Sequence, residues 1–290
     1  MIRSIERIIS STKVIEGGGF PVRRPFPTTE LDQVDPFLLL DHLGPTEWGP
    51  REAIGAPDHP HRGFETVTYL LAGENEHKDS SGHQGLLRPG DVQWMTAGSG
   101  VVHSEMPTPE FYEKGGTIHG FQIWINLPRD RKMIPPRYQD TPSEKIPEVM
   151  LEDETSRIRV IAGEFRETRA VIQTNTPILY LHVQLEPGIE ITHPSPHDHN
   201  TMAYLISGNG IFGKQDDARK AEEGQLVLFA HDGDEVFMQS PQDSRLDLLL
   251  LSGRPFNEPV VRYGPFVMNS REEIHQAFQD YQQGRMGEIE

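Results

Sequence analysis

The sequence predicts an all-β protein made of two tandem barrels, with one helix near the C-terminal end. Three observations support this prediction: short β-rich runs between turn residues, a strand motif that recurs in both halves, and a chain length suited to two domains. At 290 residues the chain is longer than one ordinary domain, so two domains of about 130 to 150 residues, each with its own core, are expected.

The short runs favour strands over an alternation of strands and helices. Gly (27) and Pro (24) are spread along the whole chain, and apolar runs of strand length lie between them. Phe121, Ile123 and Ile125 alternate with Gln122 and Trp124, which is the period-2 pattern of a half-buried strand lining a barrel wall. We expect strands at residues 65–71, 91–95, 120–127, 179–185, 202–206, 226–229 and 245–251.

A proline-rich segment between the two halves is the best linker candidate, because its prolines stand in a polar context. We place the boundary near residue 140, with an N-terminal domain at 1–140 and a C-terminal domain at 141–290. The run Tyr69-Leu-Leu-Ala-Gly73 is echoed by Tyr204-Leu-Ile-Ser-Gly208, so the halves look like copies of one barrel. The linker prolines are Pro135, Pro136, Pro142 and Pro147.

The helix is predicted at residues 270–284. Ser270 and Glu273 have the spacing of a capping box, and the apolar residues that follow share one helical face. These residues are Ile274, Ala277, Phe278 and Tyr281. We interpret the helix as a structural element packed on a barrel.

Composition excludes several classes of function. The formal net charge is −17, from 44 acidic and 27 basic residues, which disfavours direct binding to nucleic acid or to anionic membranes. The absence of cysteine excludes disulfides, zinc-thiolate sites, iron–sulfur clusters and thiol nucleophiles, so any metal must be held by His, Asp or Glu. The first residues, MIRSIERIISSTKV, lack the apolar core of a signal peptide, and no run approaches the roughly 20 apolar residues of a membrane span. We expect a soluble, monomeric, cytoplasmic protein, or a nuclear one in a eukaryote.

Two pairs of residues at i, i+2 spacing predict a metal site. His59 and His61 share one face of a strand, as do His103 and Glu105, because alternate residues of a strand point the same way. Two facing strands would bring three imidazoles and one carboxylate together. Such a set suits Fe, Mn, Co, Ni, Cu or Zn, and in an octahedral ion it leaves two positions for substrate, water or O2.

The spacing around these pairs resembles the two-part cupin motif: His-x-His-x3-Glu-x7-Gly, 16 intervening residues, then Gly90-Asp-Val and Ala97-Gly-Ser-Gly100 before His103. Longer motifs are similar to those of the pirin family and cover nearly the whole chain. They are Asp35-Pro-Phe-Leu-Leu-Leu-Asp-His42, His59-Pro-His-Arg-Gly-Phe-Glu-Thr-Val-Thr-Tyr69, Gly90-Asp-Val-Gln-Trp-Met-Thr-Ala-Gly98, His103-Ser-Glu105, Gln122-Ile-Trp-Ile-Asn-Leu-Pro128 and Gly264-Pro-Phe-Val-Met-Asn269.

Resemblance to pirins implies two tandem cupin (jelly-roll-like) barrels and one mononuclear divalent metal, with iron(II) as the expected ion. It maps the metal ligands onto His59, His61, His103 and Glu105. In many cupins the glutamate of the first motif is itself a ligand, which makes Glu65 the alternative carboxylate. The pirin-like interpretation leaves Glu65 in a supporting or structural role.

The resemblance also implies two alternative functions. Several pirins cleave flavonols such as quercetin with O2, and in that case Glu105 is the candidate catalytic base. Other pirins act as redox-sensitive partners of transcription regulators, which would make this chain a non-catalytic iron sensor that binds a protein. Fold alone does not choose between the two.

The remaining histidines receive structural interpretations. We expect His77 and His83 to be solvated, His119 and His182 to be packed polar residues, and His275 to lie on the terminal helix, while His42 could support the metal shell. In the C-terminal half, alignment of the two Tyr-Leu motifs puts Pro194 and Pro196 opposite His59 and His61, and alignment of Gly233 with Gly100 puts Val236 and Met238 opposite His103 and Glu105. That barrel is therefore predicted to hold no metal. We expect His193, His197, His199 and His231 to be loop or surface residues.

Overall fold

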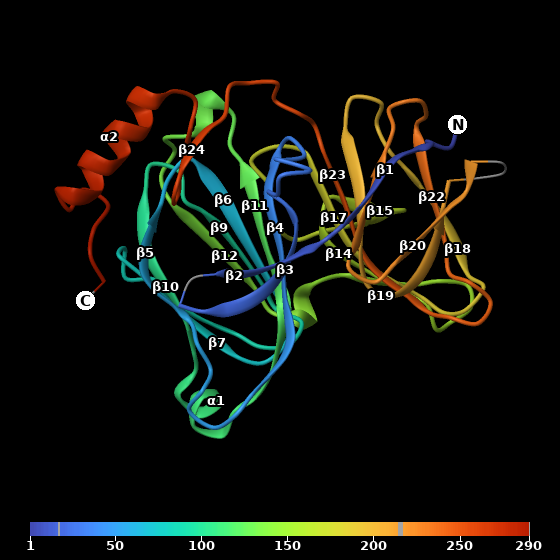
Figure 1. The fold of residues 1–290 in the computed structure, drawn as a ribbon, viewed down its shortest axis with the longest axis horizontal. Coiled ribbons are helices and arrows are strands. Elements are labelled where there is room, and N and C mark those ends of the chain that lie inside the picture. The colour runs from blue at the N-terminus through green and yellow to red at the C-terminus, as the bar shows by residue number, and fades with distance from the viewer. Residues whose placement is uncertain (17, 214–216, 290) are drawn as a thin grey trace. The chain divides into compact units, whose positions relative to one another are not determined.

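The computed structural model describes residues 1–16, 18–213 and 217–289, and it confirms the all-β prediction (Figure 1). Contacts divide the chain into two compact units. We call residues 13–143 with 256–290 the N-terminal barrel, and residues 1–12 with 144–255 the C-terminal barrel. In the described part of the chain, no helix has the length and apolar character needed to cross a membrane.

The N-terminal barrel contains a seven-stranded sheet in the order β12-β9-β6-β11-β4-β3-β2 and a four-stranded sheet in the order β5-β10-β7-β8. A hairpin, β24-β25, and two helices complete the unit. The elements are β2 (Thr12–Glu16), β3 (Phe20–Phe26), β4 (Phe37–Trp48), β5 (Ala56–His61), β6 (Phe64–Ala72), β7 (Asn75–Asp79), β8 (Gln84–Leu87), β9 (Val92–Thr96), β10 (Val101–Pro107), α1 (Pro109–Lys114), β11 (Gly116–Asn126), β12 (Arg137–Thr141), β24 (Val261–Tyr263), β25 (Phe266–Met268) and α2 (Arg271–Gln282).

The two faces of strand β11 have different surroundings, which explains why apolar residues alternate with other residues in its sequence. Phe121, Ile123 and Ile125 are fully buried, as the period-2 pattern predicts. Gln122 and Trp124 are only partly buried and line a cavity inside the unit. The alternation therefore separates a packed face of the sheet from a face that borders the cavity.

The C-terminal barrel is built around a ten-stranded sheet whose main path is β1-β21-β19-β23-β17-β14-β13. Strand β18 pairs with β22, and β20 pairs with β19. The strands are β1 (Ile5–Ser10), β13 (Glu148–Met150), β14 (Arg157–Ala162), β15 (Glu164–Phe165), β16 (Thr168–Arg169), β17 (Ile178–Leu185), β18 (Glu190–Pro194), β19 (Asn200–Phe212), β20 (Arg219–Glu222), β21 (Gln225–Phe229), β22 (Glu235–Gln239) and β23 (Leu246–Gly253).

The interior of the C-terminal barrel is filled by apolar side chains. Val236 and Met238 on β22 are fully buried and pack in one cluster with Leu248 and Leu250 of β23. These are the positions that the sequence places opposite His103 and Glu105. Packing rather than coordination occupies them, because an aliphatic side chain and a thioether are poor ligands for a divalent ion such as iron(II).

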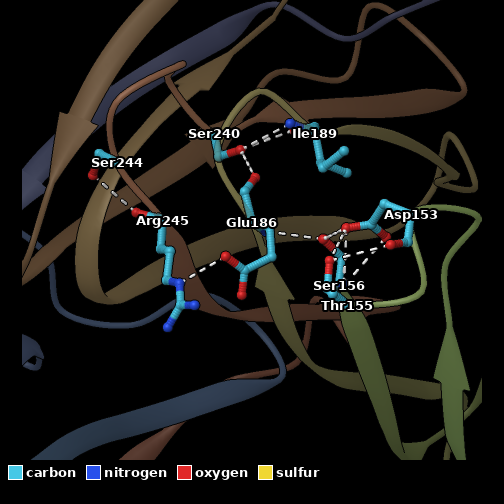
Figure 2. Close-up of polar contacts among 8 residues, drawn as sticks. All are labelled: Asp153, Thr155, Ser156, Glu186, Ile189, Ser240, Ser244 and Arg245. Atoms are coloured by element: carbon cyan, nitrogen blue, oxygen red, sulfur yellow. Dashed lines mark hydrogen bonds and ion pairs between the residues drawn. The ribbon is translucent and has the colours of Figure 1, made fainter.

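Three connections of the C-terminal barrel are held by one polar network (Figure 2). The carboxylate of Asp153 accepts hydrogen bonds from Thr155 Oγ1 (2.7 Å) and Ser156 Oγ (2.8 Å). Ser156 Oγ accepts one from Glu186 N at 2.9 Å. Ser240, which is buried, accepts from Ile189 N at 3.1 Å and donates to Glu186 O. Short polar side chains thus satisfy turn backbone groups that would otherwise be buried without partners.

Each end of the chain packs with the opposite half. The observed division therefore differs from the predicted one, which had two contiguous domains at 1–140 and 141–290. The break between the units follows Ser143, but residues 1–12 pack in the C-terminal barrel and 256–290 in the N-terminal barrel. Helix α2 begins at Arg271 after the predicted capping box. Its Ile274 and Ala277 pack with Val102 of β10, so the apolar face of the helix covers the N-terminal barrel.

Candidate metal centre

Strands β5 and β10 present the predicted ligands to one another. They pair antiparallel, with His103 opposite His59 and Val101 opposite His61. Directly opposed residues of an antiparallel pair project from the same face of the sheet, so the three imidazoles share a face. The register shifts by one position between His103 and Glu105, and Glu105 lies opposite Ala56.

The three histidines converge. Their candidate ligand nitrogens, one from each of His59, His61 and His103, all lie within 4.8 Å of one another. The ring centroids are 4.7 Å apart for His59 and His61, 4.3 Å for His59 and His103, and 4.9 Å for His61 and His103. In the described ranges this is the one group of three or more His, Asp or Glu side chains with that spacing.

Hydrogen bonding orients the rings of this histidine triad. His59 Nδ1 lies 2.7 Å from the carbonyl oxygen of Pro57, and His61 Nδ1 lies 3.4 Å from that of Pro265. An imidazole that donates from Nδ1 keeps an unprotonated Nε2 available as a ligand atom. His103 Nε2 is buried and has no hydrogen-bond partner within the described part of the chain. A metal would give this orphaned atom a partner, so the residues present fit a metal ion.

The surroundings keep the buried histidines neutral. Burial, with a smaller contribution from neighbouring His59, lowers the pKa of His61 to about 3. Burial and the three nearby histidines likewise lower the pKa of His103 well below its usual range. At neutral pH both rings therefore have lone pairs rather than charges, which is the form that binds metal.

Glu105 lies next to the triad but outside its 4.8 Å group. Its side chain is half-buried, and burial raises the pKa of its carboxyl group, against the opposing effects of His59 and Thr68. Thr68 Oγ1 lies 3.0 Å from Glu105 Oε1 and 2.6 Å from Gln122 Oε1. One hydroxyl proton serves only one acceptor at a time, so Thr68 couples the carboxylate to the amide beside it.

Glu65 is placed differently. It is fully buried on β6, and its Oε1 accepts a hydrogen bond of 2.6 Å from Thr96 Oγ1 on β9. The pairing of β6 with β9 runs without a bulge from Glu65 to Tyr69, so Glu65 points to the opposite face of the sheet from Thr68. Thr68 lines the cavity near the triad. The structure therefore directs Glu65 away from the histidines.

Two histidine predictions are wrong. His77 was expected to be solvated, but it is fully buried on β7, between β10 and β8, and burial lowers its pKa to about 4. His193 was expected at the surface, but it lies buried on β18 and stacks on Phe165 with 5.5 Å between ring centroids. In residues 75–79, Glu76 and Lys78 alternate with His77 and Asp79. This period-2 pattern could have indicated a strand whose inward face includes His77.

The other histidines follow the sequence more closely. His182 is buried and pairs with Asp247 at 2.7 Å. His197 and His231 are exposed. His42 is fully buried, and its Nε2 lies 2.8 Å from His119 Nε2.

A cavity of about 720 Å³ opens beside the triad, within the N-terminal barrel. His59, His61 and Glu105 form part of its wall. Most of the remaining wall is apolar, with a few polar groups among the aliphatic and aromatic side chains. This volume falls in the range of about 300–1,000 Å³ that is usual for small-molecule sites. Representative lining residues are Leu38, Leu70, Trp124, Thr68 and Gln122.

Two cupin-type domains, one of which gathers a histidine triad beside a cavity, define the class of this protein as a bicupin. Comparison with known proteins places it more closely. The Pirin family model matches residues 19–125, and the model of the Pirin C-terminal cupin domain matches residues 180–287. The chain belongs to the pirin family.

Its relatives come from plants, animals and bacteria. A pirin-like protein of Solanum lycopersicum is 46% identical over 94% of this chain and 89% of the relative. Human pirin is 41% identical over 96% and 92%. The crystal structure of a quercetin 2,3-dioxygenase from Acinetobacter baumannii superposes with a TM-score of 0.92 at 37% identity, covering 100% of both chains.

Proposed function

We propose that this chain is a mononuclear metal dioxygenase that cleaves flavonols such as quercetin with O2. The observation that carries the proposal is the position of the histidine triad, two of whose members, His59 and His61, line a largely apolar cavity of about 720 Å³. A relative named quercetin 2,3-dioxygenase, with the same fold along its whole length, supports the choice of substrate.

His59, His61 and His103 would hold the metal through Nε2, with Glu105 as the fourth ligand. Iron(II) is the ion we propose, although the same donors accept Mn, Co, Ni, Cu or Zn. The bound ion would supply Lewis acidity and a template for two adjacent substrate oxygens. The carbonyl groups of Pro57 and Pro265 orient the imidazoles of His59 and His61, and burial keeps those of His61 and His103 neutral by lowering their pKa.

The cavity suits a flat aromatic substrate. Leu38, Leu70 and Trp124 offer apolar wall, and the Trp124 ring lies 5.2 Å from the His61 ring. A flavonol ring system placed against these side chains would have its oxygens toward the triad. Exclusion of bulk water by the apolar walls would protect reactive species from side reactions.

Glu105 is the proposed base. Burial raises the pKa of its carboxyl group, which brings its basicity closer to that of the substrate hydroxyl than an exposed carboxylate would have. The hydroxyl of Thr68 at 3.0 Å holds the carboxylate in place. In this role Glu105 Oε2 would accept the hydroxyl proton of the bound flavonol.

The test is oxygen uptake by anaerobically iron-loaded protein mixed with quercetin, with carbon monoxide measured as a second product. We expect both signals with wild type and neither with His103→Ala, because that variant loses a ligand while the apolar core remains. Free iron at the same concentration is the background control.

A wild-type protein that binds iron but shows no turnover above free iron, across several flavonols and metals, would reject the catalytic proposal. That result would favour the alternative, in which the metal site acts as a redox sensor and the acidic chain docks on a basic protein surface.

A further inference from the structure

His77 stands behind the triad rather than in it. Strand β7 pairs with β10, which places His77 opposite Glu105 in the register. The His77 side chain is fully buried, and its ring centroid lies 5.1 Å from that of His103. The Nδ1 atoms of these two rings are 3.4 Å apart, a long hydrogen bond.

The position of the proton on the His103 ring decides whether its Nε2 atom can bind a metal. An imidazole that gives Nε2 to a metal has its proton on Nδ1, and a buried N–H needs an acceptor. For His59 and His61 that acceptor is a backbone carbonyl. For His103 the atom within hydrogen-bonding distance of Nδ1 is Nδ1 of His77, which can accept in the tautomer that has its proton on Nε2. The third member of the triad therefore depends on a side chain, which a substitution can remove.

We propose that His77 is a positioning residue that fixes the ring orientation and the metal-binding tautomer of His103. The inference rests on the proposed metal site, and it assigns to His77 the acceptor role that backbone carbonyls have for the other two histidines. The buried, partnerless Nε2 of His103 is the atom that this tautomer would present to the metal.

The local fold holds His77 in this position. Tyr138 of β12 packs against it, with 4.7 Å between ring centroids. Asp79, at the end of β7, accepts hydrogen bonds of 2.8 Å from the backbone N–H groups of Ser81 and His83. These contacts close the turn between β7 and β8 and so fix the strand that presents His77.

A pair of amide substitutions tests the position of the acceptor. In His77→Asn the side-chain oxygen can occupy the place of Nδ1, whereas in His77→Gln it reaches the place of Nε2, away from His103. We expect the Co(II) dissociation constant, measured by chelator competition, to rise about 10- to 100-fold in His77→Gln and only a few-fold in His77→Asn. The absorption bands of bound Co(II) should shift in His77→Gln and stay near wild type in His77→Asn.

His83→Gln is the matched control, because His83 is one ring further from the triad and pairs with Asp140 at 2.8 Å. It should bind Co(II) like wild type. A merely structural role for His77 would lower the melting temperature of both amide variants without separating their Co(II) affinities or spectra, and that result would overturn the inference. Wild-type affinity in His77→Gln would also overturn it. A wild-type protein that fails to bind Co(II) would instead reject the metal site itself.

Discussion

The two glutamates of the motif show how strand register places one carboxylate beside the histidine triad and turns the other away from it. Glu65 and Glu105 each follow a histidine of the motif, and spacing alone leaves both as ligands. On β6 the uninterrupted pairing with β9 turns Glu65 toward Thr96. Glu105 is on the cavity side, where Thr68 reaches it. A strand can present a residue to only one face, so the two carboxylates have different surroundings.

We predict that Glu105→Gln weakens Co(II) or Fe(II) binding at least tenfold, because the proposed fourth ligand loses its charge. Glu65→Gln should leave metal affinity near wild type, because the amide oxygen still accepts the hydroxyl of Thr96. Chelator competition on both variants measures this. The carboxylates would be assigned the wrong way round if Glu65→Gln lost the metal and Glu105→Gln kept it.

Sequence reasoning reached the triad but not the residues around it. The i, i+2 spacing identifies His59, His61 and His103 because alternation along a strand is a local property. The contact between His77 and His103 depends on how β7 pairs with β10, 26 residues apart in the chain, and no local pattern encodes that pairing. The burial of His77, in contrast, has a local signal in the alternation of residues 75–79.

At the scale of elements, helix α2 is tied to strand β5 through Asp280. This carboxylate accepts hydrogen bonds from Arg62 Nη1 at 2.6 Å, Gln276 Nε2 at 2.7 Å and Arg285 Nε at 2.8 Å. Burial by itself would raise the pKa of Asp280, but these three donors outweigh it and lower the pKa to about 2. Arg62 directly follows His61, so the helix anchors the end of the strand that holds two proposed ligands.

The lowered pKa predicts a loss of stability in acid. The unfolded carboxyl group takes up a proton near pH 3.8, while the folded one resists until about pH 2, so between these values the unfolded state binds more protons. The contribution of Asp280 to the free energy of unfolding is therefore complete above about pH 5 and falls by about 1 kcal/mol by pH 3. Denaturant titration of metal-free protein at pH 6 and pH 3 measures this. Between these pH values the free energy of unfolding should fall by about 1 kcal/mol less in Asp280→Asn than in wild type. Equal falls in variant and wild type would contradict the prediction.

The helix also shows how far local signals reach. The capping box of Ser270 and Glu273 and the apolar face were predicted and are present. The partner of that face was not predictable, because Ile274 and Ala277 would suit any apolar surface, and the one they meet includes Val102, far away in the sequence. Element type is encoded locally, and docking is encoded by complementarity across the fold.

At the scale of the whole chain, the two barrels exchange their terminal segments. Residues 1–12 belong to the C-terminal barrel, and residues 256–290 belong to the N-terminal barrel. Strand β1 pairs with β21 in the C-terminal barrel. Arg3, fully buried there, donates to the carbonyl oxygens of Gly233 at 3.1 Å, His199 at 2.9 Å and Pro196 at 2.5 Å. Such donors satisfy loop carbonyls that would otherwise be buried unpaired. A boundary read from proline content alone does not reveal this exchange.

The two barrels share a strand motif but differ in what fills them, which bears on metal stoichiometry. In the C-terminal barrel, Val236 and Met238 occupy the interior positions that correspond to His103 and Glu105. Its His197 is exposed, and its His199 is only partly buried, with Nδ1 3.3 Å from Ser252 Oγ. Within the described ranges, the triad of the N-terminal barrel is the one group of three or more His, Asp or Glu side chains close enough to hold an ion together.

We therefore predict one metal equivalent per chain. Elemental analysis after anaerobic purification should give a ratio near one for wild type and for the His197→Ala/His199→Ala double variant, because among the residues that the structure describes neither histidine belongs to a group of three ligands. The matched double variant His59→Ala/His103→Ala should fall to near zero while staying folded, since the barrel cores remain intact. A wild-type ratio close to two, with the second equivalent lost on substitution of His197 and His199, would show that the C-terminal barrel binds metal as well.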